Sequence, residues 1–306
     1  MDLSIIIPAF NEEDCIGQCL SSIQEVLKGR NVVYEVLVVD NGSVDGTSHV
    51  ASSFHRVNLI NIPRTSVAQA RNYGAKTAQG RVFAFVDSDV VLKNSWGAEI
   101  EGLCGSKKKS FVTGGQYGVR DKPSWIEKFW FGNMKSTHIN GGNLIVSRSA
   151  FFELSGFDSS LKTGEDVDFC NKASSNSEIE YTLNPEFECV HLGYPSTILQ
   201  FAKRELWHGE GDFRSLTDFW GSKIAQISVL YALVLLLIIG ALMLQKWYLA
   251  SLIFVIFMIL NYIIVCFRFD CWRFRVSIFN SLLNCVYFIS RFLSFFTAIK
   301  ARKRPY

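Results

Sequence analysis

Two long runs without a charged residue constrain this chain more than any other feature of its sequence. The runs cover residues 224–244 and 247–267, and only Gln245 and Lys246 separate them. Because a helix rises about 1.5 Å per residue, each run is long enough to cross a hydrocarbon layer of about 30 Å. The short connection implies a hairpin that returns the chain to the side from which it entered. The sequence therefore predicts a membrane anchor in residues 221–306.

A third apolar segment, residues 276–299, carries polar residues at helical spacing. This pattern places a polar stripe on one face of an apolar helix, which is typical of a helix that lies in the membrane interface. A third membrane-spanning helix is the alternative. It would put the basic residues 300–304 outside, against the usual excess of Lys and Arg on the cytoplasmic side. Arg268, Arg273 and Arg275 mark the cytoplasmic end of the hairpin in the same way.

The charge of the chain is unevenly distributed. Residues 268–306 hold eight of the 31 Lys and Arg but only one of the 28 Asp and Glu. A basic tail beside apolar helices indicates attraction to anionic membrane lipid and argues against nucleic acid as a partner. The eight cysteines are scattered without zinc or disulfide spacing, and we find no secretory signal at the N-terminus. We expect a multi-pass protein of the cytoplasmic (inner) membrane whose first domain lies in the cytoplasm.

The first ninety residues alternate strand and helix signals. Short runs rich in Ile and Val end in Pro, Asn, Gly or Asp, as buried strands that lead into loops do. This order is typical of an α/β domain with a Rossmann-like, mainly parallel sheet and helices on both faces, which binds ligands at the carboxyl ends of its strands. We assign residues 1–220 to this domain. The predicted strands are 3–7, 34–39, 57–62 and 82–86, and the predicted helices are 12–28, 45–54 and 66–79.

Acidic residues follow the fourth predicted strand directly, in the triplet Asp87-Ser88-Asp89. Two carboxylates one residue apart at a strand end can both turn toward a divalent metal, which prefers oxygen ligands and accepts further oxygens from phosphate. An isolated Asp-x-Asp is more often a solvated turn. Residues at or near the ligand-binding end of the predicted sheet raise its value: Pro8, Phe10, Asn11 and Glu12 after the first strand, Asp40 after the second, and Arg71 before the fourth.

These motifs together resemble the nucleotide-binding half of the family 2 inverting glycosyltransferases, which have the fold known as GT-A. The resemblance implies that Asp40 contacts the nucleotide and that Asp87 and Asp89 hold Mg²⁺ or Mn²⁺ on the diphosphate of a nucleotide sugar, with Ser88 and Arg71 beside it. The family usually carries a second acid after the first, whereas this chain has Asn41. That departure bears on the choice of base rather than on nucleotide binding.

A second group of motifs matches the acceptor side of the same family. Gly164-Glu165-Asp166 follows Gly141-Gly142-Asn143 along the chain. The resemblance implies that Asp166 is the general base, because inverting transfer needs a carboxylate to take the proton of the acceptor hydroxyl. Gly142, Asn143 and Glu165 are expected beside the acceptor. Taken alone, Glu165 and Asp166 would read as acids favoured at a helix N-terminus.

Three later residues carry weaker signals. His191 occupies a position that in related transferases contacts the metal or diphosphate, although a lone histidine is more often structural. Arg204 and Trp207 resemble the acceptor motif of processive synthases at a different spacing. An amphipathic helix at the membrane surface, with Phe201, Leu206 and Trp207 in lipid, explains them as well. The aromatic stretch 125–131 reads either as a mobile loop over the site or as a packed loop.

The function that these motifs predict is transfer of a sugar from a nucleotide diphosphate sugar to a hydroxyl of a lipid-linked saccharide, in the synthesis of surface polysaccharide or another glycan. Three alternatives remain open from the sequence. They are direct transfer to polyprenyl phosphate, processive polymerisation, and a non-catalytic membrane scaffold that binds nucleotide sugar.

Overall fold

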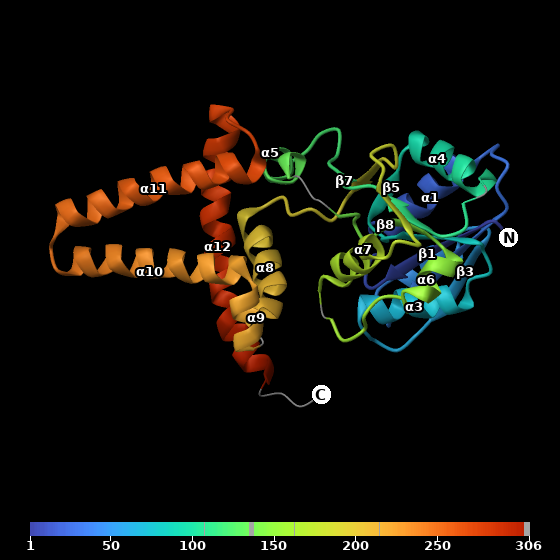
Figure 1. The fold of residues 1–306 in the computed structure, drawn as a ribbon, viewed down its shortest axis with the longest axis horizontal. Helices are drawn as coiled ribbons and strands as arrows, with labels where there is room; N and C mark the ends of the chain where they lie inside the picture. The colour runs from blue at the N-terminus through green and yellow to red at the C-terminus, as the bar shows by residue number, and fades with distance from the viewer. Residues whose placement is uncertain (107, 135–137, 162, 214, 303–306) are drawn as a thin grey trace. The chain divides into compact units, whose positions relative to one another are not determined.

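The structure is a computed structural model that describes residues 1–106, 108–134, 138–161, 163–213 and 215–302. The chain divides into two compact units (Figure 1). The first contains Met1–Arg120 and Ser136–Gly193, and the second contains Asp121–Lys135 and Tyr194–Tyr306. Residues 194–220 thus belong to the same compact unit as the apolar helices. The assignment of 1–220 to one domain stays a prediction.

The first unit is built on a seven-stranded sheet of order β3-β2-β1-β4-β8-β6-β9. The first four of these strands are parallel, β8 runs antiparallel to both of its neighbours, and β9 is parallel to β6. The α/β prediction is therefore confirmed. The strands are β1 (Leu3–Ala9), β2 (Tyr34–Asp40), β3 (Val57–Asn61), β4 (Val82–Val86), β6 (Phe111–Gly114), β8 (Asn143–Ser147) and β9 (Glu180–Leu183).

Helices cover both faces of this sheet. Successive side chains of β1 and β4 point to opposite faces of the sheet, so that Ile5 and Ala84 belong to one core and Ile6 and Phe83 belong to the other. The first core is covered by α1 (Ile16–Leu27), α2 (Thr47–Ser52) and α4 (Asn94–Gly105). The second core is covered by α3 (Val67–Thr77), α6 (Arg148–Glu153) and α7 (Glu165–Ser175). Figure 1 shows the helices on the two sides of β1.

A small second sheet completes the first unit. It has the order β5-β10-β7, with β5 (Val90–Leu92), β10 (Cys189–His191) and β7 (Tyr117–Gly118). Strand β5 begins one residue after Asp89, and β10 pairs antiparallel with it, so that His191 lies opposite Val90. Strand β7 pairs with the other edge of β10, where Tyr117 lies opposite Cys189. This sheet therefore gathers residues from three distant parts of the chain beside the end of β4.

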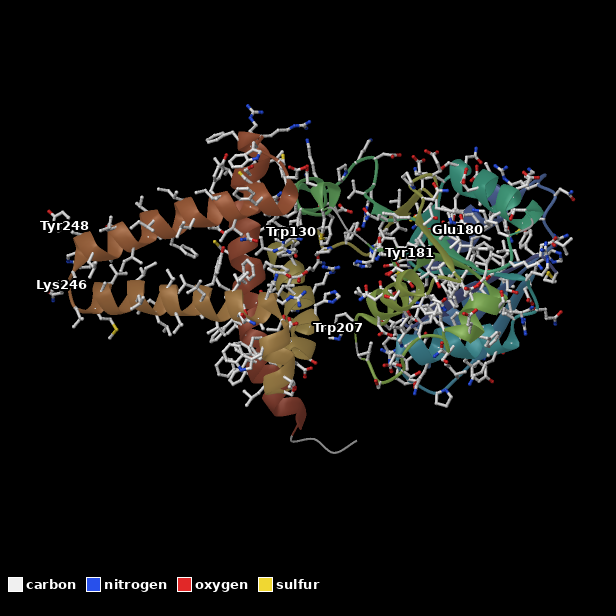
Figure 2. All side chains as sticks on the ribbon, in the orientation of Figure 1. Trp130, Glu180, Tyr181, Trp207, Lys246 and Tyr248 are labelled. Carbon is white, nitrogen blue, oxygen red and sulfur yellow. The ribbon has the colours of Figure 1, made fainter. Side chains whose placement is uncertain are left out.

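The second unit is helical. Its helices α10 (Lys223–Met243) and α11 (Trp247–Phe269) form the predicted hairpin, and Lys246 and Tyr248 lie at its closed end (Figure 2). Within the described residues, three helices are long and apolar enough to cross a membrane: Lys223–Met243, Trp247–Phe269 and Phe274–Ala298. The elements of this unit are α5 (Trp125–Phe129), η1 (Phe131–Asn133), α8 (Ile198–Gly209), η2 (Glu210–Phe213), α9 (Leu216–Gly221), α10 (Lys223–Met243), α11 (Trp247–Phe269) and α12 (Phe274–Arg302).

The aromatic stretch 125–131 is packed within this second unit. Trp130 is 1% exposed, and its ring contacts Phe201 of α8, Phe269 of α11 and Tyr287 of α12 at centroid distances of 5.2, 5.0 and 5.4 Å. The packed alternative for this stretch is therefore correct. The expectation that Phe201 dips into lipid is wrong, because this side chain is fully buried among those rings.

The polar stripe of α12 does not face outward, as an interfacial amphipathic helix would require. Asn284 is fully buried and donates to Asn261 of α11 and to the hydroxyl of Tyr231 of α10, at 2.8 and 3.1 Å. The sequence argument for an interfacial helix is wrong on this point, because polar side chains of the hairpin replace water as partners. Figure 1 nevertheless shows α12 running across the hairpin with α8 alongside it.

Candidate active site

The loops that follow β1 and β2 meet at the carboxyl edge of the large sheet. The loops after β1 and β2 are joined directly, because Asn11 donates its backbone N–H to the Ser43 hydroxyl (3.0 Å) and accepts from the backbone of Val44 (2.9 Å). Asn11 adopts a left-handed conformation with φ of 55°, which asparagine tolerates better than most residues. Pro8 lies within β1, and Phe10 beside Asn11 is 36% exposed.

Asp40 ends β2 and is 3% exposed. Its carboxylate accepts from the backbone N–H of Ser43 at 2.9 Å and from the hydroxyl of Ser48. Asn41, which stands where the family usually has a second acid, makes two hydrogen bonds to the backbone of Thr65, at 2.8 and 2.9 Å. The amide at this position therefore fixes the loop after β3, which an acid could not do with the same pair of bonds.

Arg71 of α3 is the central cation of the site. Its side chain is 4% exposed, and its two terminal nitrogens bind different carboxylates, Asp87 Oδ1 and Glu165 Oε1, each at 2.7 Å. Burial would lower the pKa of Arg71, but the two carboxylates raise it above its ordinary value, so the guanidinium stays charged. One side chain thereby joins the end of β4 to the first turn of α7.

Asp87 and Asp89 lie in different surroundings. Both oxygens of Asp87 are already bound, Oδ1 by Arg71 and Oδ2 by the Tyr117 hydroxyl at 2.7 Å. Burial opposes ionisation, but Arg71 and Tyr117 hold the pKa of Asp87 below its usual value. Asp89 lies 3.3 Å from Nε2 of His191, and burial raises its pKa, with His191 acting in the opposite direction. Ser88 between them is 5% exposed.

Asp166 stands at the start of α7, one residue after Glu165. Its Oδ2 accepts from the backbone N–H of Gly141 at 3.1 Å, and its Oδ1 accepts from Val167 at 2.9 Å. The side chain is only partly buried, in contrast to Glu165, which is 7% exposed. Asp166 is therefore the accessible acid of the pair. Glu165, predicted to face the acceptor, is instead committed to Arg71.

The loop before β8 closes the site between these two groups. A Cβ on Gly142 would lie 2.2 Å from Asp87 Cγ, and one on Gly141 would lie 3.0 Å from Asp166 Cβ. Only glycine leaves room for both acids here. The structure corrects the sequence prediction that Asn143 lies beside the acceptor. It is fully buried, and its amide binds the indole of Trp96 (3.0 Å) and the backbone carbonyl of Phe187 (2.7 Å), so it cannot contact an acceptor.

The remaining predicted residues divide between the two units. His191 lies in the first unit, where its Nε2 is 3.3 Å from Asp89 Oδ2, and its role as a metal ligand stays a prediction. Arg204 and Trp207 belong to the second unit, where Arg204 pairs with Glu205 at 2.6 Å and Trp207 is 45% exposed. Their assignment to the acceptor side stays a prediction. Figure 2 shows Trp207 on α8.

Two residues at the site have no counterpart in the sequence prediction. Tyr117 binds Asp87, and its ring packs on His191 at a centroid distance of 4.7 Å. Arg64 stacks on Phe10, with its guanidinium carbon 3.3 Å from the ring centre. The glycines at 114 and 115 before Tyr117, and the Pro63-Arg64 pair after the third strand, were the available signals. Neither indicates a partner so distant along the chain.

The α/β sheet carries acids at the ends of its strands, and the buried Arg71 binds two carboxylates of the site, Asp87 and Glu165. The chain belongs to glycosyl transferase family 2, because residues 4–156, half of its length, match the model of that family. The predictions of this family and of the GT-A fold are thereby confirmed.

Known proteins similar to this chain include AglE, a glycosyltransferase of Haloferax volcanii, which is 24% identical over 81% of this chain and 84% of its own. A dolichyl-phosphate beta-glucosyltransferase of Trichomonas vaginalis is 32% identical over 39% of this chain and 41% of its own. The mannosyltransferase PcManGT of Pyrobaculum calidifontis, solved in complex with GDP-Man and Mn²⁺, has a similar fold, with a TM-score of 0.52 and 17% identity over 68% of this chain and 61% of its own. The chain thus spans less than two thirds of the last two proteins.

Proposed function

We propose that this glycosyltransferase is metal-dependent and inverting, and that it moves a sugar from a nucleotide diphosphate sugar to a hydroxyl of a lipid-linked saccharide in the synthesis of a surface polysaccharide or other glycan. The observation that carries the proposal is the bridge made by Arg71. It binds Asp87 on the donor side and Glu165, the neighbour of the proposed base Asp166, each at 2.7 Å. One buried guanidinium then holds both the carboxylate on the donor side and the neighbour of the proposed base.

The donor would bind over the ends of β1 and β2. Phe10 and Arg64 offer a stacked pair to a base, and Asp40 offers a carboxylate to a base edge or ribose hydroxyl. Asp40 already accepts from Ser43 and Ser48, so a nucleotide hydroxyl would share or replace the Ser48 bond. Comparison with PcManGT supports this class of donor, since that protein was solved with GDP-Man and Mn²⁺.

The residues around Asp89 fit a divalent cation. Asp89 and His191 approach within 3.3 Å of each other, while Asp87 has both oxygens occupied. Among the described residues no group of three His, Cys, Asp or Glu forms a complete ligand set. This fits Mg²⁺ or Mn²⁺, which is commonly held by one or two protein ligands together with substrate phosphates and water. Such an ion would stabilise the charge that develops on the diphosphate as it leaves.

Glu12 supplies a prediction about this metal. Its pKa is raised to about 7 by burial and by the charges of Asp89 and Asp87. Near pH 7 the free protein would therefore hold a fraction of a proton on Glu12, and a cation bound beside these acids would expel it. Calorimetry of Mn²⁺ binding in two buffers of different ionisation enthalpy should show net proton release at pH 7. Affinity should fall as the pH is lowered from 8 to 6.

Glu12→Gln is the matched variant for this measurement. It removes the titrating group but keeps the side-chain volume, so proton release and the pH dependence of Mn²⁺ affinity should both shrink. Equal proton release from the variant and the natural protein would contradict the assignment.

The chemical step would be a single displacement at the anomeric carbon. The acceptor oxygen forms a bond to this carbon while the bond to the diphosphate breaks, and the nucleoside diphosphate leaves. The hydroxyl proton passes to Asp166, whose partly exposed carboxylate is oriented by Gly141. Arg71 fixes the distance between the two ends of the reaction by holding Asp87 and Glu165 together.

The donor class can be tested by thermal shift. A ligand that binds only the folded state stabilises it by about 2.7 kcal/mol at a hundred times its Kd. We expect one of UDP-, GDP- or dTDP-sugars to raise the melting temperature by several degrees with Mn²⁺, and much less with EDTA. No shift with any of these donors, in the presence of metal, would contradict the proposed donor class.

The second unit would hold the enzyme at the inner face of the cytoplasmic membrane. Leu236 and Leu237 of α10 and Leu252 of α11 are each more than half exposed, which suits a lipid environment. If α10 and α11 span the bilayer, α12, which runs across them, would lie along the membrane surface (Figure 1). A lipid-linked acceptor would then be presented at that surface.

This topology predicts which residues a membrane-impermeant maleimide can reach in intact cells. In a chain whose eight native cysteines are replaced, Lys246→Cys in the hairpin turn should be labelled from outside. Lys223→Cys, at the start of α10, should be labelled only after the membrane is opened. Labelling of both in intact cells, or of neither, would contradict a spanning hairpin.

A further inference from the structure

Tyr117 occupies an unusual position in the candidate active site. It lies on the short strand β7, and the pairing of β7 with β10 places it opposite Cys189. Its backbone N–H donates to the side chain of Asn140 at 2.8 Å, and its ring packs on His191. The backbone and the ring of Tyr117 are therefore held in place by contacts that do not involve its hydroxyl.

The hydroxyl of Tyr117 joins two parts of the site. It donates to Asp87 Oδ2 at 2.7 Å and accepts from the backbone N–H of Gly142 at 2.8 Å. Burial, followed by the charge of Asp87, raises the pKa of this phenol well above its ordinary value, so the hydroxyl keeps its proton. Its single hydrogen is committed to Asp87, and a lone pair is committed to the loop before β8.

These bonds close a ring of contacts around the site. From Asp87 the ring passes through Arg71 to Glu165, each step at 2.7 Å. Glu165 is followed by Asp166, whose carboxylate accepts from Gly141 at 3.1 Å. The next residue along the chain is Gly142, which donates to Tyr117 and so returns to Asp87. Two routes thus hold the proposed base Asp166: one runs through Arg71 and Glu165, and the other runs through Gly141 and Gly142. The second route includes the Tyr117 hydroxyl.

We propose that Tyr117 is a positioning residue that ties the donor-side carboxylate Asp87 to the Gly141–Gly142 loop and thereby aims Asp166 at the sugar acceptor. This inference rests on the proposed function and deepens it. Loss of the hydroxyl removes both of its bonds and leaves the Gly141–Gly142 loop tied to Asp87 only by the longer backbone bond from the Asp87 N–H to the Gly142 carbonyl at 3.3 Å, while Arg71 still holds the Asp87 carboxylate in place. The defect should therefore fall on transfer to the acceptor and not on binding of the donor.

The test uses Tyr117→Phe in the full chain, with Tyr34→Phe as the matched control. The phenyl ring keeps the packing on His191 and loses only the two bonds of the hydroxyl. Tyr34, half-buried at the start of β2, lies outside the ring of contacts. Four quantities are measured with Mn²⁺ present: transfer to an acceptor in a membrane extract, hydrolysis of the donor by water, the Kd of the nucleoside diphosphate, and the melting temperature.

For Tyr117→Phe we expect transfer to fall by about 10- to 100-fold, since a misplacement of about 1 Å can cost about 100-fold. Donor hydrolysis and the nucleoside diphosphate Kd should change by less than about 3-fold, because diphosphate binding does not involve Asp166 and a water molecule is small enough to attack without being held in the acceptor site. The ratio of transfer to hydrolysis should thus fall at least about 10-fold. Tyr34→Phe should leave all four quantities unchanged.

Gly142→Ala probes the same ring from the loop side. Its methyl group would lie 2.2 Å from Asp87 Cγ and 2.5 Å from the Tyr117 hydroxyl, so it must push the loop away. We expect the same fall in the ratio of transfer to hydrolysis, and no further fall when Gly142→Ala and Tyr117→Phe are combined. This variant decides the question if Tyr117→Phe fails to fold.

Two results would overturn the proposal. One is unchanged transfer by Tyr117→Phe. The other is a proportional loss of transfer, hydrolysis and nucleotide affinity, which would mean that the tyrosine only supports the fold. Failure of the proposed function is distinguishable from both, because the natural protein itself would then neither bind nor hydrolyse any nucleotide sugar.

Discussion

Replacing Asp166 with asparagine is expected to lower kcat for transfer to a hydroxyl acceptor by about 10²- to 10⁴-fold, the usual contribution of a general base. The amide has the size of the carboxylate, and its oxygen can still accept from Gly141. The Kd of the donor should therefore stay within about 2-fold of the natural value, since the hydrogen bond from Gly141 is kept. The measurement is release of nucleoside diphosphate at saturating donor, with a membrane extract as the source of acceptor.

Asp168→Asn provides the control on the same helix. Asp168 lies in the first turn of α7, two residues after Asp166, and its partly exposed side chain pairs with Lys172 at 2.6 Å, so its loss should leave the rate nearly unchanged. A fully active Asp166→Asn would contradict the hydroxyl acceptor. It would favour direct transfer to polyprenyl phosphate, because a phosphate nucleophile has no proton for a base to remove.

Arg71→Met should have the largest effect on stability. The substitution keeps much of the buried stem but leaves Asp87 and Glu165 without their cation, and breaking a buried pair in this way costs about 3–5 kcal/mol. For a domain of this size, the melting temperature should fall by about 6–20 °C. Thermal unfolding of the purified full chain measures the shift, and transfer should be lost as well.

The controls for Arg71→Met separate burial from charge. Arg81→Met removes a side chain that is 60% exposed and pairs with Asp2 at 3.1 Å, and it should cost no more than about 1 kcal/mol. Adding Glu165→Gln to Arg71→Met should restore part of the loss, since it removes one of the two stranded charges. A change in melting temperature below 2 °C for Arg71→Met would contradict the central place given to this residue.

The parallel half of the fold was predictable because its signals are local. Strand β4 has the predicted bounds, and β1 extends the predicted 3–7 by two residues. Each of these strands is a fully buried, mainly apolar run that ends near Pro, Asp or Asn, so the hydrophobic pattern and the turn residues predict the same strand boundaries. Helix α1 begins at Ile16 instead of residue 12, and the Glu12 carbonyl accepts from the backbone N–H of Ile16 at 2.9 Å.

The errors arise where a side chain meets a partner far along the chain. Asn143 was placed beside the acceptor, but its amide serves Trp96 and Phe187, respectively 47 and 44 residues away. Tyr117 was missed because its partners Asp87 and Gly142 come from two other segments. The polar stripe of α12 was read as water-facing, since a sequence pattern cannot distinguish water from buried partners such as Asn261. Pairings of this kind need the fold before they can be seen.

The most direct test of the account is the anomeric configuration of the product. Methanol can replace the acceptor hydroxyl, and the methyl glycoside that forms keeps its configuration, which NMR reads from the anomeric coupling constants. A single displacement aided by Asp166 predicts the configuration opposite to that of the donor sugar. A methyl glycoside with the donor's own configuration would contradict the proposal that one base and one departing diphosphate act on opposite sides of the sugar.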